Sequence, residues 1–169
     1  QGVLRAPQTA LKGTTMITNP TDNAHQALTA GLNRLLADTF ALYLKTKNFH
    51  WHVRGPQFRD LHLLFDEQAA AIFALTDLIA ERVRKNGAAT LTSIGAIAAA
   101  SRIADQDDAA LSAEAMIAEL AADNRTLIAG LREVKELAGA AGDNATEGAV
   151  DDWTDQAEQR VWFLTSLAA

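Results

Sequence analysis

Four side chains that can bind metal ions lie at helical spacing in the stretch from His50 to Glu81. They are His62, Asp66, Asp77 and Glu81. On an α-helix that turns about 100° per residue, the three carboxylates lie near 40°, 60° and 100° from the histidine. All four side chains therefore project from one stripe of one helix.

These side chains form two pairs, His62 with Asp66 and Asp77 with Glu81, each spaced one helical turn apart. Such a pair can hold one cation, and imidazole with carboxylate suits iron, manganese or zinc. At about 1.5 Å per residue, Asp66 and Asp77 are roughly 16 Å apart along the axis, too far to share an ion. Each pair is therefore an incomplete metal site. The other interpretation is the polar, solvent-facing side of an amphipathic helix.

The missing ligands must come from elsewhere in the chain or from a second chain. Bundles that hold two metals internally take Glu-x-x-His pairs from several helices, but all four histidines lie in the first 62 residues. An internal histidine-rich centre is therefore poorly supported. The alternative is a second, antiparallel copy whose Asp77 and Glu81 meet the first chain's histidine and aspartate, which gives two equivalent sites per dimer.

The composition favours a single helical domain. With 169 residues, the chain is long enough to bury a core without disulfides or structural metals. The absence of cysteine excludes disulfides, thiolate nucleophiles and cysteine-bound zinc. Hydrophobic residues make up 49% and charged residues 21%, a balance that suits packed helices and not disorder.

Hydropathy predicts a soluble protein with no membrane partner. The absence of cysteine is compatible with the expected cytoplasmic location, and secretion stays open as the alternative. No apolar run approaches the roughly 18 residues needed to cross a bilayer, and residues 1–20 lack the apolar core of a secretory signal. The net charge of −6 disfavours a globally basic nucleic-acid surface and favours cations as partners.

Residues 1–20 are expected to form a flexible N-terminal tail, because they show no periodicity. Apart from the terminus, their charges are those of Arg5 and Lys12. Two cations give a tail only weak, salt-sensitive attraction to DNA. DNA as a partner is therefore weakly supported.

Apolar residues at helical spacing predict a first long helix over 22–52. Gly55-Pro56 ends it, because proline disfavours the helical conformation in the residue before it. A second long helix is predicted from 58 to about Gly87, where glycine supplies a C-terminal stop.

The second half of the chain predicts one short and two long helices. The short helix lies between 90 and 104. The third long helix follows a cap at Ser112 and ends at the glycines of 139–142. Asn144 and Glu147 resemble a capping box that opens the last helix.

This layout predicts an all-α fold, a four-helix bundle with a short extra helix in the connection between helices two and three. We expect one bundle domain over 21–169 behind the tail of 1–20.

The stretch NFHWHVRGPQF, residues 48–58, resembles the signature of the Dps mini-ferritins, the DNA-binding proteins from starved cells. The pairs His62 with Asp66 and Asp77 with Glu81 continue the resemblance to Arg82. The helical layout extends it over nearly the whole chain after the tail.

The resemblance implies a ferritin-like bundle, twelve copies of which assemble into a hollow tetrahedral shell. It also implies ferroxidase centres, each with two irons, at the twofold interfaces. One subunit would supply His50, His62 and Asp66, and its neighbour would supply Asp77 and Glu81.

The resemblance further implies that iron(II) is oxidised, preferentially by hydrogen peroxide, and stored inside the shell as a ferric mineral. Removing both reactants suppresses hydroxyl radical formation and so protects DNA and the cell. Carboxylates stabilise iron(III) more than iron(II), which favours this oxidation. The alternative function is a non-catalytic nucleoid protein that coats and compacts DNA, which would need a cationic surface.

Two roles are open for Trp51, which follows the implied ligand His50. It packs between helices, or it acts in catalysis as a sacrificial electron donor for stray oxidants. His52 lies about 200° from His50 on an ideal helix, so we do not expect it to bind the same iron.

Two other polar groups also have two interpretations. Asp22 and His25 form either an accessory metal site near the tail or a polar cluster at a helix start. Acids gather at the start of the last helix: Asp143, Glu147, Asp151, Asp152 and Asp155. They resemble the acidic threefold pore of the family, although acids also stabilise a helix N-terminus through its dipole.

Overall fold

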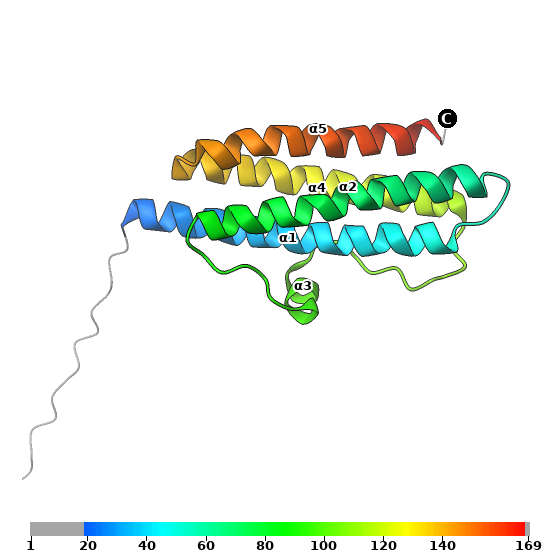
Figure 1. The fold of residues 1–169 in the computed structure, drawn as a ribbon, viewed down its shortest axis with the longest axis horizontal. Helices are drawn as coiled ribbons and strands as arrows, with labels where there is room; N and C mark the ends of the chain where they lie inside the picture. The colour runs from blue at the N-terminus through cyan, green and yellow to red at the C-terminus, as the bar shows by residue number, and fades with distance from the viewer. Residues whose placement is uncertain (1–18, 168–169) are drawn as a thin grey trace, which may run out of the picture.

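Five α-helices and no β-strand make up residues 19–167, the part of the chain that the computed structural model describes. Four long helices run side by side, and a short one lies outside them against α1 (Figure 1). The helices are α1 (Pro20–His52), α2 (Phe58–Lys85), α3 (Ile94–Ala100), α4 (Ala113–Ala141) and α5 (Asn144–Ser166). The predicted bundle, with its extra helix between helices two and three, is confirmed.

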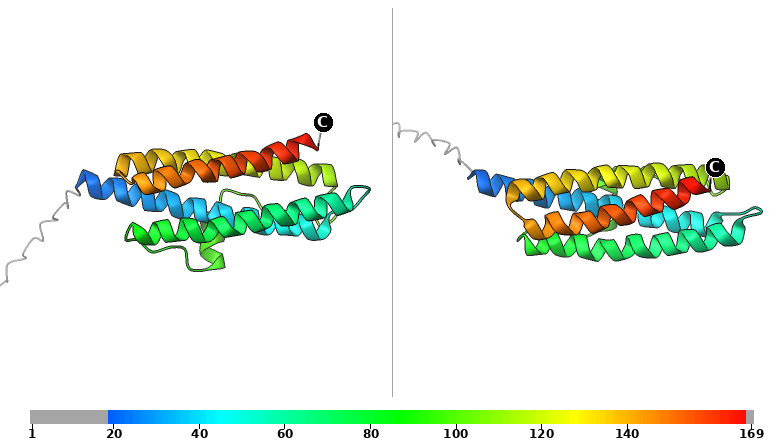
Figure 2. Two further views of the ribbon diagram at one scale, coloured as in Figure 1. Left: turned by 45° about the horizontal axis from the view of Figure 1, so that its top comes forward. Right: turned by 90° about the horizontal axis from the view of Figure 1, so that it is seen from above.

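The long helices pack as two pairs, α1 with α2 and α4 with α5, and α1 also packs along α4 (Figure 2). Their apolar stripes meet in a single core. Fully buried side chains include Leu32, Leu42 and Phe49 of α1 and Phe65 and Ile72 of α2. Each such side chain contributes roughly 1.5–3 kcal/mol relative to exposure. Packing, and not helix propensity alone, therefore fixes how α1 and α2 face each other.

The N-terminal caps show one correction. Ser112 caps α4 as expected, and Ser93 caps α3, each accepting a backbone hydrogen bond through its hydroxyl oxygen. The last helix, however, is capped by Asp143, whose carboxylate accepts from the Thr146 backbone N–H at 3.0 Å. The predicted capping box of Asn144 is therefore displaced by one residue, because the neighbouring carboxylate takes the cap position.

The turn between α4 and α5 depends on Gly142, which has a φ of +70°. L side chains rarely adopt this left-handed conformation, so glycine is the favoured residue there. The predicted end of the third long helix at 139–142 is confirmed. The turn brings the start of α5 back along α4.

A buried aspartate of α1 binds an arginine in the segment that follows α3. Asp38 is fully buried and accepts from the Arg102 backbone N–H at 2.6 Å and from its side-chain Nε at 2.9 Å. Gly130 of α4 leaves room for this arginine, since a Cβ there would lie 2.5 Å from its Nη2. The long connection between α2 and α4 is thereby held against the bundle.

No helix among residues 19–167 is long and apolar enough to span a membrane. The predicted tail falls almost wholly outside the described residues.

Candidate functional site

His50 near the end of α1 and His62 near the start of α2 face each other across the turn that joins these helices. Their rings stack with centroids 3.9 Å apart and planes 19° apart. The Nδ1 of each ring lies 2.7 Å from the backbone carbonyl oxygen of the other residue. A carbonyl only accepts, so each Nδ1 donates, and the neutral ring keeps its Nε2 lone pair free for a metal ion.

Asp66 lies one turn after His62 and beside this histidine pair. Its Oδ1 is 3.8 Å from the His50 Nε2. Lys47 of α1 donates to the same oxygen at 2.6 Å. That hydrogen bond lowers the pKa of Asp66 below its ordinary value, and partial burial opposes the effect. The carboxylate is therefore ionised at neutral pH, with a lysine already bound to it.

Asp77 and Glu81 are exposed on α2, further along the same helix. Lys85 donates to a Glu81 carboxylate oxygen at 2.9 Å, and this hydrogen bond lowers the pKa of Glu81. Among the described residues, no group of three or more His, Cys, Asp or Glu side chains is arranged to hold a metal ion. One chain thus places the predicted ligands in two separate groups and completes neither of them.

Exposed apolar side chains line the same side of α1 and α2 as the predicted ligands. On α2, Leu63 and Phe73 are 43% and 52% exposed and lie near 100° and 20° from His62. On α1, Leu44 and Trp51 are 59% and 58% exposed. Large apolar side chains gathered on one face are typical of a protein interface. The predicted metal ligands therefore lie within a surface suited to contact another chain.

Trp51 does not pack between the helices of its own chain, so that interpretation is wrong for the isolated subunit. Its ring is largely exposed and lies 5.9 Å from the Lys47 Nζ. His52 turns away from His50, with its Nδ1 2.8 Å from the Asn48 backbone oxygen.

At the other end of α1, the His25 Nδ1 lies 3.0 Å from the Thr21 backbone oxygen. Within the described residues, Asp22 and His25 belong to no metal-binding cluster. The polar cluster at a helix start agrees with this geometry better than the accessory metal site does.

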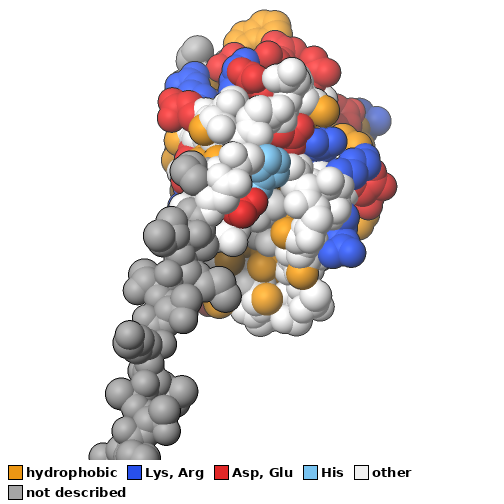
Figure 3. All heavy atoms as spheres, turned by 90° about the vertical axis from the view of Figure 1, so that its left-hand side faces the viewer, with side chains coloured by type: hydrophobic (Ala, Val, Ile, Leu, Met, Phe, Trp, Pro, Cys, Tyr) orange, Lys and Arg blue, Asp and Glu red, His pale blue; other side chains and the backbone are white. Residues whose placement is uncertain are grey.

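Two of the five acids at the start of α5 already bind polar or cationic side chains of the same chain. Asp143 accepts from Arg82 and Asn86, and Asp151 pairs with Lys135. At this end of the bundle, Asp and Glu side chains are interspersed with Lys and Arg (Figure 3). An acidic pore would therefore have to be formed by Glu147, Asp152 and Asp155. The pore stays a prediction.

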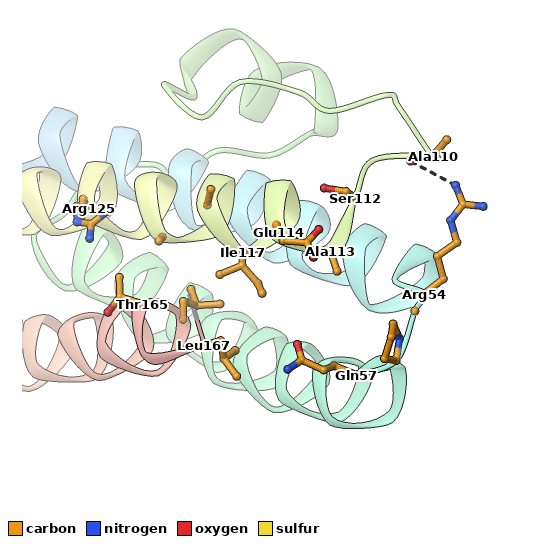
Figure 4. Close-up of a pocket in the computed structure, with 15 residues that line it drawn as sticks. Arg54, Gln57, Ala110, Ser112, Ala113, Glu114, Ile117, Arg125, Thr165 and Leu167 are labelled. Carbon is orange, nitrogen blue, oxygen red and sulfur yellow. Dashed lines mark hydrogen bonds between the residues drawn. The ribbon is translucent and has the colours of Figure 1, made fainter. Parts of the chain in front are cut away.

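A hollow of about 920 Å³ lies at the end of the bundle where α1 turns into α2 (Figure 4). Its lining includes Arg54, Glu114 and Arg125 over an apolar floor that includes Ile117 and Leu167. Among the described residues, its lining holds one carboxylate and no histidine, so it does not resemble a metal site.

Lys47 is the site residue that the sequence analysis missed. It lies three residues before His50 and four before Trp51, so helical spacing alone places it on the same side of α1. Its pairing with Asp66, 19 residues away, could not be read from that spacing, because it depends on how α1 and α2 pack.

Comparison with known proteins gives a family model and close structural neighbours. The model of the ferritin-like domain matches residues 29–169. The DNA protection during starvation protein of Brevibacillus brevis is 32% identical over 136 residues, which cover 80% of this chain and 91% of that protein.

Two solved structures show the same fold. Dps from Thermosynechococcus elongatus superposes with a TM-score of 0.86 at 28% identity, covering 89% of this chain and 96% of that one. A Dps protein of Vibrio cholerae, described as a ferritin-like diiron-carboxylate protein, gives 0.83 at 27% identity over 95% and 100% of the two chains.

Proposed function

The chain belongs to the Dps family of ferritin-like proteins, and on that basis we propose that it is a ferroxidase and iron store. Iron(II) is oxidised, with hydrogen peroxide as oxidant, at sites shared between two chains. The ferric product is kept as mineral inside a hollow shell of twelve copies. By consuming iron and peroxide together, the protein protects DNA and the cell from oxidative damage.

The observation that carries this proposal is the symmetric placement of the two incomplete groups on α2. Counted along the sequence, the midpoint between His62 and Glu81 is position 71.5, and the midpoint between Asp66 and Asp77 is the same position. A twofold axis crossing α2 between Ala71 and Ile72 therefore brings each group of one chain opposite the other group of its partner. The exposed Phe73 lies close to this axis.

The completed site would combine His50, His62 and Asp66 of one chain with Asp77 and Glu81 of the other. Two neutral imidazoles and three carboxylates form a nitrogen and oxygen ligand set that suits iron. Three negative charges stabilise iron(III) more than iron(II). Five ligands for two irons leave positions open for peroxide.

The electron balance fits a centre with two irons. Two iron(II) ions lose one electron each, and hydrogen peroxide takes up both electrons with two protons to give two water molecules. No hydroxyl radical is released when both electrons arrive together. The structure supports this proposal by leaving the Nε2 atoms of both histidines free.

The direct test is the double variant Asp66→Ala, Glu81→Ala. Mixed with iron(II) and peroxide, the parent should develop the absorbance of soluble ferric iron, and the variant should not. Asp60→Ala is the matched control, because Asp60 is an exposed aspartate of α2 outside the ligand stripe. If the double variant oxidises iron as fast as the parent while its assembly stays intact, the site assignment is wrong.

The alternative, a non-catalytic protein that coats DNA, is favoured only by the names of relatives such as that of Brevibacillus brevis. Several cations of the described surface are already paired, including Arg34 with Glu133 and Lys135 with Asp151. Gel retardation across a salt series distinguishes the two functions. Retardation that persists in the double variant would support DNA coating, and none at low salt would exclude it. We place the protein in the cytoplasm, with the nucleoid as a location only if DNA binds.

A further inference from the structure

The sequence contains a single Asn-Gly pair, Asn86-Gly87, at the position where α2 ends. In such a pair the backbone nitrogen of the glycine can attack the asparagine side-chain carbon Cγ, so that a succinimide ring forms and ammonia leaves. Water then opens the ring and leaves aspartate or isoaspartate in place of the asparagine. Glycine has no side chain to hinder this attack. Asn86 is therefore the most reactive asparagine of the unfolded chain.

The fold keeps the two reacting groups of this pair apart. The Asn86 ψ of 11° places the Gly87 nitrogen beside the backbone nitrogen of Asn86 and turns it away from the side chain. The Gly87 N–H donates to the Arg84 backbone oxygen at 3.0 Å. The Asn86 Nδ2 donates to the Arg82 backbone oxygen at 2.9 Å and to the Asp143 carboxylate at 2.8 Å. Ring closure needs the reacting atoms close together and aligned, so the folded geometry is unreactive.

The Asp143 acceptor belongs to α5, so the position of the Asn86 amide depends on the junction between α2 and α5. Arg82 Nη2 donates to both Asp143 carboxylate oxygens at 2.7 Å, and Arg82 Nε donates to the Thr146 hydroxyl at 2.8 Å. If these two helix ends separate, the amide loses its charged acceptor and is free to turn. Such local openings need less free energy than global unfolding.

We propose that Asn86 is a latent deamidation site, which reacts only when the end of α2 and the start of α5 separate. The reaction consumes one water molecule, releases one ammonia molecule and needs no enzyme or cofactor. It adds one negative charge beside Asp143. The proposal does not rest on iron chemistry.

The product cannot re-form the contacts of the amide. Both contacts of the Asn86 Nδ2 are with acceptors, the Arg82 carbonyl and the Asp143 carboxylate. An ionised carboxylate has no donor, so at neutral pH both contacts would become repulsive. One arginine would then face two carboxylates. Deamidation therefore makes the separation of the two helix ends irreversible.

Incubation of the assembled, iron-free protein at pH 8 and 37 °C tests the proposal. Peptides produced by pepsin in acid, where deamidation is slow, report each asparagine separately by mass spectrometry. In the folded parent, Asn86 should react far more slowly than in the parent unfolded in urea. Asp143→Ala should accelerate the reaction in the folded protein roughly tenfold or more, because it removes the charged acceptor that holds the junction.

Two controls show that the effect is confined to this junction. Asn23, exposed on α1 and followed by alanine, should react at the same rate in the parent and in the variant. Asp152→Ala, at an exposed aspartate of α5, should leave the Asn86 rate unchanged. If Asp143→Ala does not assemble, Thr146→Val takes its place. It removes the hydroxyl that binds both Arg82 and Asp143, and it should also accelerate the reaction.

The variant Asn86→Asp reproduces the direct product, and its thermal unfolding tests the irreversible step. Its Tm should lie below that of Asn86→Ala, which removes the same hydrogen bonds without adding a charge. In the Asp143→Ala background this difference should shrink, because the opposing carboxylate is gone.

Either of two deamidation results would overturn the proposal. One is an Asn86 rate in the folded parent that equals the rate in urea. The other is an Asn86 rate that neither Asp143→Ala nor Thr146→Val raises. A Tm of Asn86→Asp at or above that of the parent would mean that the product restores the junction, and the irreversible step would be wrong.

Discussion

A lysine binds one carboxylate in each of the two groups of predicted ligands on α2. Lys47 is held between α1 and α2 with 20% of its side chain exposed, and it binds Asp66. Lys85 binds Glu81 from one turn further along the helix, with 58% of its side chain exposed. In the proposed site, an incoming cation must displace both ammonium groups. The more buried Lys47 is the stronger competitor, because exposed ion pairs contribute little.

Replacing Lys47 by alanine should therefore tighten metal binding. We expect zinc, which is not oxidised, to bind roughly two- to fivefold more tightly at pH 7, a gain in the range of one partly exposed ion pair. Below about pH 5 the gain should shrink, because the pKa of Asp66 returns toward 3.8 without its lysine and protons then compete with the metal. Isothermal titration calorimetry measures both effects.

Lys135→Ala is the control for this substitution, since Lys135 pairs with the exposed Asp151 on the α4 and α5 side of the bundle. It should leave zinc affinity unchanged. Equal affinities for Lys47→Ala and the parent would show that Lys47 does not compete for the metal.

Two exposed tryptophans allow a test of the proposed electron donor. Trp51 is 58% exposed beside His50, and Trp162 is 65% exposed on α5. After turnover with iron(II) and excess peroxide, mass spectrometry should find Trp51 oxidised several-fold more than Trp162, because the stray oxidants of incomplete, one-electron turnovers would arise at the iron, beside Trp51. The double variant Asp66→Ala, Glu81→Ala should lose the preference. If Trp51 and Trp162 were oxidised equally in the parent, Trp51 would have no role as an electron donor for stray oxidants.

At the scale of elements, α2 and α5 are joined by a network around Asp143. Arg82 donates to both Asp143 carboxylate oxygens at 2.7 Å, and Asn86 donates to one of them at 2.8 Å. Burial would raise the pKa of Asp143, but hydrogen bonds from Thr146, Asn86 and Arg82 outweigh it and hold the pKa well below 3.8. Because Arg82 follows Glu81, this network also fixes the end of α2 that carries a proposed ligand.

The lowered pKa predicts how stability depends on pH. The stabilisation by ionised Asp143 is fully present above the pKa of about 3.9 in the unfolded chain and is lost as pH falls toward the folded value. Asp143→Asn should lower the free energy of unfolding at pH 7 by about 1–2 kcal/mol. Its stability should also change less than that of the parent between pH 6 and pH 3.

Thermal unfolding followed by circular dichroism over that pH range measures both effects. Asp152→Asn, at an exposed aspartate of α5, is the control and should follow the parent. If the stability of Asp143→Asn changed with pH as much as that of the parent, the pH dependence could not be assigned to Asp143.

The helices could be predicted from the sequence because their signals are local. Apolar periodicity and the breaks at Gly55-Pro56 and Gly142 mark them within a few residues. The cap of α5 was placed one residue late, since Asp143 is fixed partly by residues of α2 that lie 57 and 61 positions away. The hydrogen bond from Lys47 to Asp66 could not be predicted for the same reason. Contacts between helices far apart in sequence leave no periodic signal.

At the scale of the whole molecule, the proposed site exists only where two chains meet. The sequence predicts this by its two incomplete groups of predicted ligands. Neither the sequence nor a single chain contains the partner's position, so the geometry of the completed site could not be derived from them.

Mixed assemblies test the shared site directly. Asp66→Ala and Glu81→Ala subunits should each be inactive alone, because each removes a ligand from both sites of a dimer. When the two are dissociated and reassembled together, half of the pairs are hybrids, and each hybrid has one intact site. About a quarter of the parent activity should therefore return. No recovery in assemblies that native mass spectrometry shows to be mixed would mean that each site lies within one chain.

The helix α2 is continuous between its two groups of proposed ligands. This continuity limits which insertions and deletions the gene can tolerate. A point substitution between 66 and 77 alters one side chain, whereas one inserted residue turns everything beyond it by about 100° around the helix axis. The two groups would then leave their common stripe, and both sites of a dimer would be lost at once. Descendants of this gene should accordingly diverge by replacement within that segment and gain or lose codons only outside it.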